Sequence, residues 1–299
     1  MLLERAARRV GERVRYFVFS FVTSLMVLAV MYSFLMNVVH PNTQRASADL
    51  RQVGEDAFAP SAKDALTVLF MGAENARTPP GSYLLARFDP AQGMVAVSAM
   101  PGNMQVYNGS ARESLAEVFA FGGVRYTIDL IEKTLGIPID RYVRLTPESF
   151  VAAAGVIGSV MFSLPEPLTI EQDGALTELM EGVQLIDGRR AVQLLRHDFP
   201  GSTEALDMLE SIAAEIINQR RDVILSTMIN SIFERIVNTV DTDISYADYI
   251  DRLPAAQYLA RLPQDVARVV SFSGIQDTEA GFIVPADTFI AEVRRYFGG

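Results

Sequence analysis

The sequence predicts an α/β domain in which a mixed central sheet is flanked by helices on both faces, preceded by one transmembrane helix. Two observations carry this prediction. From residue 65 onward, short apolar runs typical of strands alternate with helical patterns, and residues 16–39 form an uncharged apolar segment. Alternating strands and helices favour a sheet covered by helices. The chain has 299 residues, 49% of them hydrophobic, and is therefore long enough to bury a core of its own.

Charge divides the chain into three zones. Residues 1–15 carry a net charge of +3 from five Arg and two Glu, residues 16–39 carry none, and residues 40–299 carry −13. This acidic surplus argues against a nucleic-acid partner, which would need a basic surface. The chain has no Cys, which excludes disulfides, a thiol nucleophile and Cys-ligated metals.

The uncharged segment 16–39 is long enough to cross a bilayer. As a helix it would span roughly 36 Å, against a hydrocarbon core of about 30 Å. Aromatic residues stand near both ends, with Tyr16 and Phe17 at the first and Tyr32 and Phe34 near the second. The Arg cluster before the segment indicates that the N-terminus is cytoplasmic and the rest of the chain extracytoplasmic.

Two other interpretations of this segment remain. Ala46-Ser47-Ala48 resembles a signal-peptidase site, but the apolar run is about twice the length of a signal-peptide core. A buried core helix would not need five Arg before it. We therefore expect a single-pass protein of the cell membrane with four parts. They are a cytoplasmic basic tail at 1–15, a transmembrane helix at 16–39, a stalk at 40–63 and an extracytoplasmic domain at 64–299.

The first half of the domain begins with three strands. Residues 83–88 and 94–100 form a hairpin, because Asp89-Pro90 ends one apolar run and Pro101 ends the next. Gly122-Gly123 separates two helical patterns that follow. Thr146 and Pro147 are typical of an N-cap and a first helical position. The predicted elements are strands at 66–71, 83–88, 94–100, 142–145 and 159–164, and helices at 112–121, 124–135 and 147–157.

The second half is mostly helical. Apolar residues recur at spacings of three and four from 203 to 240, which predicts one long or slightly broken amphipathic helix. The remaining predicted elements are helices at 188–195, 245–260 and 286–296, and strands at 266–272 and 282–284.

Six segments, taken in order, resemble the LytR-CpsA-Psr family of the bacterial cell envelope. They are Leu69-Phe70-Met71-Gly72, the hairpin at 84–100, Phe119-Ala120-Phe121-Gly122-Gly123, the Leu-Gly-Ile-Pro-Ile-Asp at 135–140, the Gly-Val-Gln-Leu-Ile-Asp-Gly at 182–188 leading to Arg196, and the tail at 273–285. The resemblance implies a protein that moves glycopolymers from a polyprenyl-pyrophosphate carrier to peptidoglycan. It also implies Arg side chains on the pyrophosphate, Asp side chains around a divalent metal, and an apolar channel for the lipid.

Most charged positions of the family pattern are substituted in this chain. The family's Arg-Ser-Asp-Thr falls on residues 79–82, so that Gly81 and Ser82 occupy its last two positions. Its Pro-Arg-Asp falls on 101–103 and leaves Gly102 and Asn103, and a second Arg near 196 is replaced by Asp198. Further charged positions fall near Ser114, Thr203 and Leu206. Of the expected charges, Arg196 alone is kept, and it is the one catalytic candidate.

Three arginines are candidates for anion binding: Arg77, Arg87 and Arg196. Arg87 lies between apolar neighbours on a strand and is expected to point either into the same pocket or to solvent. Arg196-His197-Asp198 is the densest polar cluster, although adjacent residues of a helix or strand point apart. No metal site is predicted, and Mg²⁺ is expected only if the chain is a transferase.

The resemblance also suggests residues that would line a lipid channel. They are Phe150, Val151, Val156, Met161 and Phe162, all of which could equally be packed core. Partners are expected to be the membrane bilayer and a polyprenyl-linked glycopolymer or a cell-wall protein.

Three functions remain open. In the first, the domain is a non-catalytic relative that binds a polyprenyl-linked glycopolymer or an envelope partner. In the second, it is an active transferase whose rearranged site uses Arg77, Arg87 and Arg196. In the third, it is an envelope scaffold whose long helix from Thr203 docks a partner. Transferase chemistry requires the three arginines to converge in one cleft.

Overall fold

A computed structural model describes residues 58–109, 111–172, 175–197, 202–224, 229–277, 279 and 281–298. They belong to a compact unit that runs from Phe58 to Gly299. The predicted tail, the transmembrane segment and most of the stalk lie outside the described residues. Within the described ranges, none of the helices combines the length and apolar character that a membrane crossing requires.

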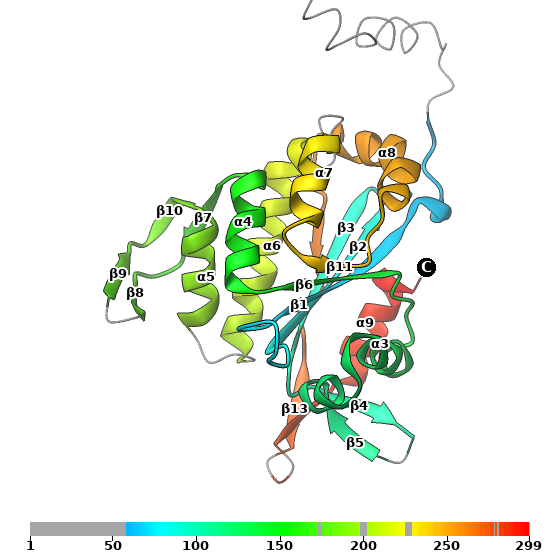
Figure 1. Ribbon diagram of the computed structural model, residues 1–299, viewed down its shortest axis with the longest axis vertical. Helices are drawn as coiled ribbons and strands as arrows, with labels where there is room; N and C mark the ends of the chain where they lie inside the picture. Colours follow the sequence, from blue (N-terminus) through cyan, green and yellow to red (C-terminus); the bar gives the residue numbers. More distant parts are fainter. Residues whose placement is uncertain are drawn as a thin grey trace, which may run out of the picture. The chain divides into compact units, whose positions relative to one another are not determined.

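The centre of the domain is a six-stranded mixed sheet (Figure 1). The strand order is β11 (Asp241–Thr242), β6 (Arg141–Leu145), β1 (Leu66–Gly72), β2 (Ser82–Asp89), β3 (Met94–Pro101) and β12 (Ala267–Val269). The pairs β1/β6 and β3/β12 are parallel and the other pairs are antiparallel. The prediction of a mixed α/β fold is therefore confirmed.

One face of the sheet packs against α3 (Leu115–Leu135) and α9 (Asp287–Phe297). Side chains from β1 and β2 meet those of the two helices in a core whose members are almost all fully buried. Its largest side chains include Tyr83, Leu69, Met71, Leu85, Leu130, Ile131, Phe289 and Phe297.

The opposite face is covered by a second group of helices (Figure 1). They are α4 (Pro147–Ile157), α5 (Gly188–His197), α6 (Thr203–Ile224), α7 (Ile229–Val237) and α8 (Tyr246–Ala260). The start of α4 is as predicted, because Thr146 Oγ1 accepts a hydrogen bond from the Ser149 N–H at 3.3 Å and Pro147 is the first helical residue.

Two ribbons stand beside this helical layer. The hairpin of β8 (Leu168–Gln172) and β9 (Ala175–Leu179) was not expected, and β7 (Val160–Leu164) pairs with β10 (Gly182–Ile186). Their inner faces form a core of their own with α5 and α6, which includes Phe162, Leu164, Ile186, Leu194 and Ile212. The helical layer is thus held together partly by contacts that do not involve the central sheet.

Two predictions of secondary structure need correction, and one is confirmed. Residues 112–114 belong to β5 (Ala111–Ser114), which pairs with β4 (Gln105–Asn108), so the helix begins only at Leu115. The predicted break at Gly122-Gly123 is confirmed, because α3 consists of two helical segments joined by a kink at Gly123, whose φ of 64° and ψ of −160° are not helical and suit glycine alone. The strand expected at 266–272 is paired only over Ala267–Val269.

The end of the chain also carries a small hairpin, formed by β13 (Gly274–Asp277) and β14 (Phe282–Pro285). The amphipathic pattern at 203–240 corresponds to α6 and α7, between which residues 225–228 are outside the described part of the chain.

A buried carboxylate attaches α6 to the edge of the sheet. Glu210 is 1% exposed and accepts hydrogen bonds from the Ala99 N–H at 2.7 Å and from Ser271 Oγ at 3.1 Å. Ala99 pairs with Leu84 of β2 on one side, but on the other side β12 ends before it, so the carboxylate takes the place of the missing ladder bond. Burial raises the pKa of Glu210 to about 7, against these hydrogen bonds, which lower it.

We therefore expect stability to depend on Glu210 between about pH 4.5 and pH 7. Because the folded state holds the proton more tightly than the unfolded state, this contribution is complete below the unfolded pKa and is lost as the pH rises through the folded pKa. Urea unfolding of residues 58–299 should show the wild type losing up to ~3 kcal/mol from pH 5 to pH 8 through this group.

The matched variant is Glu210→Gln, which keeps an acceptor for the Ala99 N–H but does not titrate. The free energy of unfolding of this variant should increase relative to that of the wild type as the pH rises. Parallel pH profiles for the two proteins would contradict this account of Glu210.

Candidate functional site

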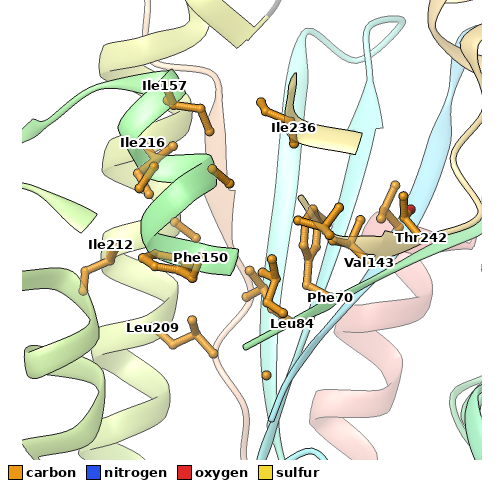
Figure 2. Close-up of a pocket in the computed structure, with 18 of the residues that line it drawn as sticks. Phe70, Leu84, Val143, Phe150, Ile157, Leu209, Ile212, Ile216, Ile236 and Thr242 are labelled. Carbon is orange, nitrogen blue, oxygen red and sulfur yellow. The ribbon is translucent and has the colours of Figure 1, made fainter. Parts of the chain in front are cut away.

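A cavity of about 700 Å³ lies between the sheet and the second group of helices (Figure 2). Figure 2 shows Phe70, Leu84 and Val143 on the sheet side, with Phe150 and Ile157 of α4 and Leu209, Ile212 and Ile216 of α6 across from them. Most of the residues that line it are apolar, and the lining includes two arginines, Arg196 and Arg221. Its size falls within the range of ordinary ligand pockets.

The strand pattern explains why the sheet offers an apolar floor. Alternate residues of a strand point to opposite faces. On β2, Leu84, Ala86 and Phe88 face the cavity, whereas Tyr83 and Leu85 belong to the core on the other face. The floor is made by Leu66, Val68, Phe70, Leu84, Ala86, Phe88, Val95, Val97, Val143 and Leu145.

The helical spacing of α4 supplies part of the roof. Phe150, Ala153, Ala154 and Ile157 recur at intervals of three and four and all line the cavity. Of the five residues predicted to line a lipid channel, only Phe150 has this position. Val151 and Val156 lie on other sides of α4, and the ribbon residues Met161 and Phe162 are respectively 46% exposed and buried in the core beneath the ribbon.

One end of the cavity is polar. It is formed by the loop that follows β1, the start of β2 and the last turn of α5, and its polar members are Glu74, Thr78, Ser82 and Arg196. Arg196 donates from Nε to Glu74 Oε1 at 3.2 Å and from Nη2 to Glu74 Oε2. The Arg196 side chain is 35% exposed and that of Glu74 is 64% exposed, so this ion pair is open to solvent and worth little on its own.

The two loops predicted to carry substituted family positions do lie side by side. Gly81 and Ser82 line the cavity, and the Gly102 N–H donates to the Gly81 carbonyl at 2.9 Å. A Cβ on Gly102 would stand 3.0 Å from the carbonyl oxygens of Pro80 and Gly81, so the backbone leaves little room there for a side chain. Asn103 points elsewhere, with Nδ2 3.4 Å from the Gly281 carbonyl.

Two further sequence candidates do not enter this end of the cavity. Arg77 is exposed, and only its backbone N–H is bonded within the loop, to Asn75 Oδ1 at 2.9 Å. Asp198 lies outside the described residues.

Arg87 is neither in the cavity nor in solvent, so both expectations for it are corrected. It lies on the same face of β2 as Tyr83 and Leu85, and is 5% exposed. Its Nε contacts Asp89 Oδ2 at 3.4 Å, and its Nη1 donates to Thr67 Oγ1 at 3.1 Å and to the Phe297 carbonyl at 3.4 Å. Arg87 therefore ties α9 to the sheet, and the three candidate arginines do not converge.

Sequence reasoning missed another cation near the polar end, Arg144 on β6. Its Nη2 donates to the Thr78 carbonyl at 2.9 Å, and its guanidinium lies 5.0 Å from the centre of the Phe119 ring. Its buried Nε has no hydrogen-bond partner. The side chain occupies the α3 side of the sheet, opposite the cavity. Arg144 reaches this place through the pairing of β6 with β1, two segments far apart in the sequence, so no local pattern pointed to it.

The polar end does not fit a Mg²⁺ site. Mg²⁺ is held by carboxylate oxygens, and Glu74, already paired with Arg196, is the one acidic residue among those described as lining the cavity. The positions at which we expected the Asp residues of the family pattern are Gly81 and Asn103. Within the described ranges, no three His, Cys, Asp or Glu side chains cluster as a metal would require.

Comparisons with known proteins agree with this fold. The model of the LytR_cpsA_psr family matches residues 32–281. The curated "Polyisoprenyl-teichoic acid--peptidoglycan teichoic acid transferase TagU" of Halalkalibacterium halodurans is 24% identical over 72% of this chain and 73% of its own length.

Two solved structures share the fold at lower identity. The crystal structure of Bacillus subtilis TagV superimposes with a TM-score of 0.67 at 19% identity, over 79% of this chain and 97% of the other. A structure of "TagT bound to LI-WTA" gives a TM-score of 0.62 at 16% identity, over 82% and 94% of the two chains.

The position of Arg87 leads to a prediction. Arg87→Met should destabilise residues 58–299 by about 3 kcal/mol, because it leaves the Asp89 carboxylate buried without its cation. Asp89→Asn added to this variant should recover part of the loss, as measured by urea unfolding. If Arg87→Met were as stable as the wild type, the buried pair would have no structural role.

Proposed function

The chain belongs to the LytR-CpsA-Psr family, and we propose that its domain binds a polyprenyl-linked glycopolymer of the cell envelope without transferring it. In this proposal the isoprenoid chain occupies the apolar cavity, and the phosphate lies at the polar end beside Arg196. The observation that carries the proposal is the apolar cavity whose polar end holds one arginine, Arg196, already paired with Glu74.

The cavity supports a long hydrocarbon ligand rather than a compact polar one. Ten residues of the sheet floor are apolar, and so are the facing residues of α4 and α6. Each CH₂ group removed from water there contributes about 0.8 kcal/mol. Glu74, Ser82 and Arg196 form the polar end, and the second arginine of the lining, Arg221, donates from Nη1 to the Gln264 carbonyl at 2.6 Å. The names of the relatives, which act on polyisoprenyl-linked teichoic acid, suggest the same kind of ligand.

The polar end supports binding of one phosphate but not transfer of a glycopolymer. A forked guanidinium such as that of Arg196 suits a phosphate. To bind one, Arg196 would have to exchange the carboxylate of Glu74 for the oxygens of the ligand. Stabilising a pyrophosphate leaving group needs several cations or a metal directed at the developing charge. Here Arg87 is on the other face of the sheet, Arg77 is exposed, and the acidic residues for Mg²⁺ are missing from the described lining.

The proposal places the domain outside the cytoplasmic membrane. Residues 16–39 would be the single transmembrane helix, with the basic residues 1–15 in the cytoplasm, and residues 40–57 would link the helix to the domain. A lipid-linked ligand would then reach the domain from the same membrane.

Blocking the cavity should abolish lipid binding. Ala86→Phe puts a phenyl ring on the cavity floor between Leu84 and Phe88, and should reduce the affinity of the full chain for polyprenyl phosphate in detergent at least ~10-fold by displacing several buried CH₂ groups. The control is Ala152→Phe, which adds the same ring at an exposed position of α4. Equal affinity of the two variants would overturn the proposed lipid site.

Freeing Arg196 should strengthen binding of the phosphate. Glu74→Gln removes the competing carboxylate and is expected to raise the affinity for polyprenyl phosphate by ~5-fold, whereas Arg196→Ala should lower it by a similar factor. Arg77→Ala, in the same loop, should leave the affinity unchanged. A loss of affinity in Glu74→Gln would show that the phosphate does not use Arg196.

The transferase interpretation is tested by turnover. The full chain, incubated with a polyprenyl-pyrophosphate-linked glycopolymer, peptidoglycan and Mg²⁺, should release no polyprenyl phosphate above the level seen with Arg196→Ala. Release by the wild type that Arg196→Ala abolishes would overturn the non-catalytic proposal and establish a rearranged transferase site.

A further inference from the structure

Helix α8 exposes a stripe of apolar and aromatic side chains along its whole length. The stripe consists of Tyr246, Ile250, Pro254 and Tyr258, which follow one another at intervals of four residues. Tyr246 is 48% exposed, Ile250 is 40% exposed and Tyr258 is 38% exposed. Residues four apart lie on one face of a helix, so the four side chains form one continuous surface.

The orientation of this stripe is fixed by the opposite face of α8. Ala255, Ala256 and Leu259 are buried there. Asp248 binds the guanidinium of Arg141, with Oδ1 at 2.7 Å from Nη2 and Oδ2 at 2.8 Å from Nε. Although burial opposes ionisation, the hydrogen bonds from Arg141 and Ser245 lower the pKa of Asp248 to about 2. The helix therefore cannot rotate to hide the stripe without breaking a buried ion pair.

Helix α8 lies where the N-terminal part of the chain joins the domain. The short helix η1 (Ala62–Asp64) packs against α8, and Arg252 of α8 donates from Nε and Nη2 to the Ala65 carbonyl at 3.4 Å. The uncharged segment ends at Val39. Residues 40–57 can span at most about 60 Å when extended and roughly 23 Å as a flexible coil. A domain held this close to a bilayer brings α8 near the bilayer surface.

The same helix also closes the far end of the cavity. Tyr249 lines the cavity together with Phe233 of α7, and their rings stack with centroids 5.4 Å apart. The end of the cavity away from Arg196 is thus adjacent to the exposed stripe. Tyrosine and aliphatic side chains in one surface are typical of the membrane interface, where the ring is apolar and the hydroxyl remains in water.

We propose that the α8 stripe rests on the outer surface of the bilayer and turns the Tyr249 end of the cavity toward the membrane. This inference rests on the proposed function, because it supplies the side from which the isoprenoid chain would reach the cavity. A second exposed apolar surface, formed by Met161, Val183 and Leu185 on the β7/β10 ribbon, has no comparable link to the N-terminal segment.

The test uses the absence of cysteine from the chain. Two variants are made, Ile250→Cys on the stripe and Leu185→Cys on the ribbon as the matched control. Each is labelled at its single cysteine with the same small fluorophore. The full chain is reconstituted into phosphatidylcholine–phosphatidylglycerol vesicles whose acyl chains are brominated near the head group. Quenching at position 250 should exceed that at position 185 by at least about twofold.

Several outcomes would overturn the proposal. They are equal quenching at the two positions, quenching at position 185 alone, failure of the full chain to sediment with vesicles, and cross-linking of position 250 between two copies without quenching by the lipid.

A second measurement separates this surface from the cavity. Ile250→Ser with Tyr258→Ser should slow the transfer of polyprenyl phosphate from vesicles to the full chain several-fold, while its affinity in detergent stays that of the wild type. Tyr246 is left unchanged because its ring contacts Phe233 and Tyr249. Unchanged transfer would count against membrane docking, whereas loss of wild-type affinity in detergent would count against the proposed lipid site.

Discussion

The two faces of the central sheet are packed differently, and the rest of the structure follows from this difference. On one face, α3 and α9 fill the space above β1 and β2 completely, with large side chains such as Tyr83, Phe289 and Phe297 at or near zero exposure. On the other face the helices stand away from the sheet and leave a cavity of about 700 Å³. An apolar cavity of this size costs stability, and its walls would close on each other unless contacts elsewhere held them apart.

Two sets of contacts hold the walls apart. The helices α5 and α6 have their own core with the β7/β10 and β8/β9 ribbons, so they do not need to collapse onto the sheet to bury their apolar residues. At the edge of the sheet, α6 is fixed by hydrogen bonds as well as by the packing of Ile217 against the cluster of Val95, Leu259 and Val266. Glu210 accepts from the Ala99 N–H, and Asn218 Oδ1 accepts from the N–H groups of Val266 and Ala267, both at 2.9 Å. Because hydrogen bonds set a distance and a direction, these contacts position α6 without closing the cavity.

Local patterns predicted much of the fold, whereas the packing between distant segments was not predictable. The strands from Leu66 to Pro101 and the capped start of α4 follow from apolar runs, turn residues and a Thr-Pro pair, which act over a few residues. The errors occurred where a distant partner decided the structure. Residues 111–114 become a strand because β4 pairs with them, and Arg87 is buried because Thr67 and the end of α9 supply its acceptors. For the site, the two-residue alternation of side chains along β2 predicts that Arg87 and Leu84 lie on opposite faces of the sheet. Only the structure shows which of the two faces holds the cavity.

The composition of the cavity bears on where a ligand's binding energy would come from. A single arginine that shares its charge with Glu74 and is one-third exposed can add only about 1 kcal/mol for a phosphate. The apolar walls contribute about 0.8 kcal/mol for every CH₂ group they remove from water, so a few isoprenoid units outweigh the whole polar end. Selectivity would then reside in the hydrocarbon chain rather than in the phosphate. Under the proposed function, such a site would hold a lipid carrier equally well before and after the loss of its glycopolymer. Interactions that are equally strong in the ground state and in the transition state do not accelerate the chemical step. The substitutions expected at Gly81 and Gly102 would therefore favour a protein that retains its lipid ligand.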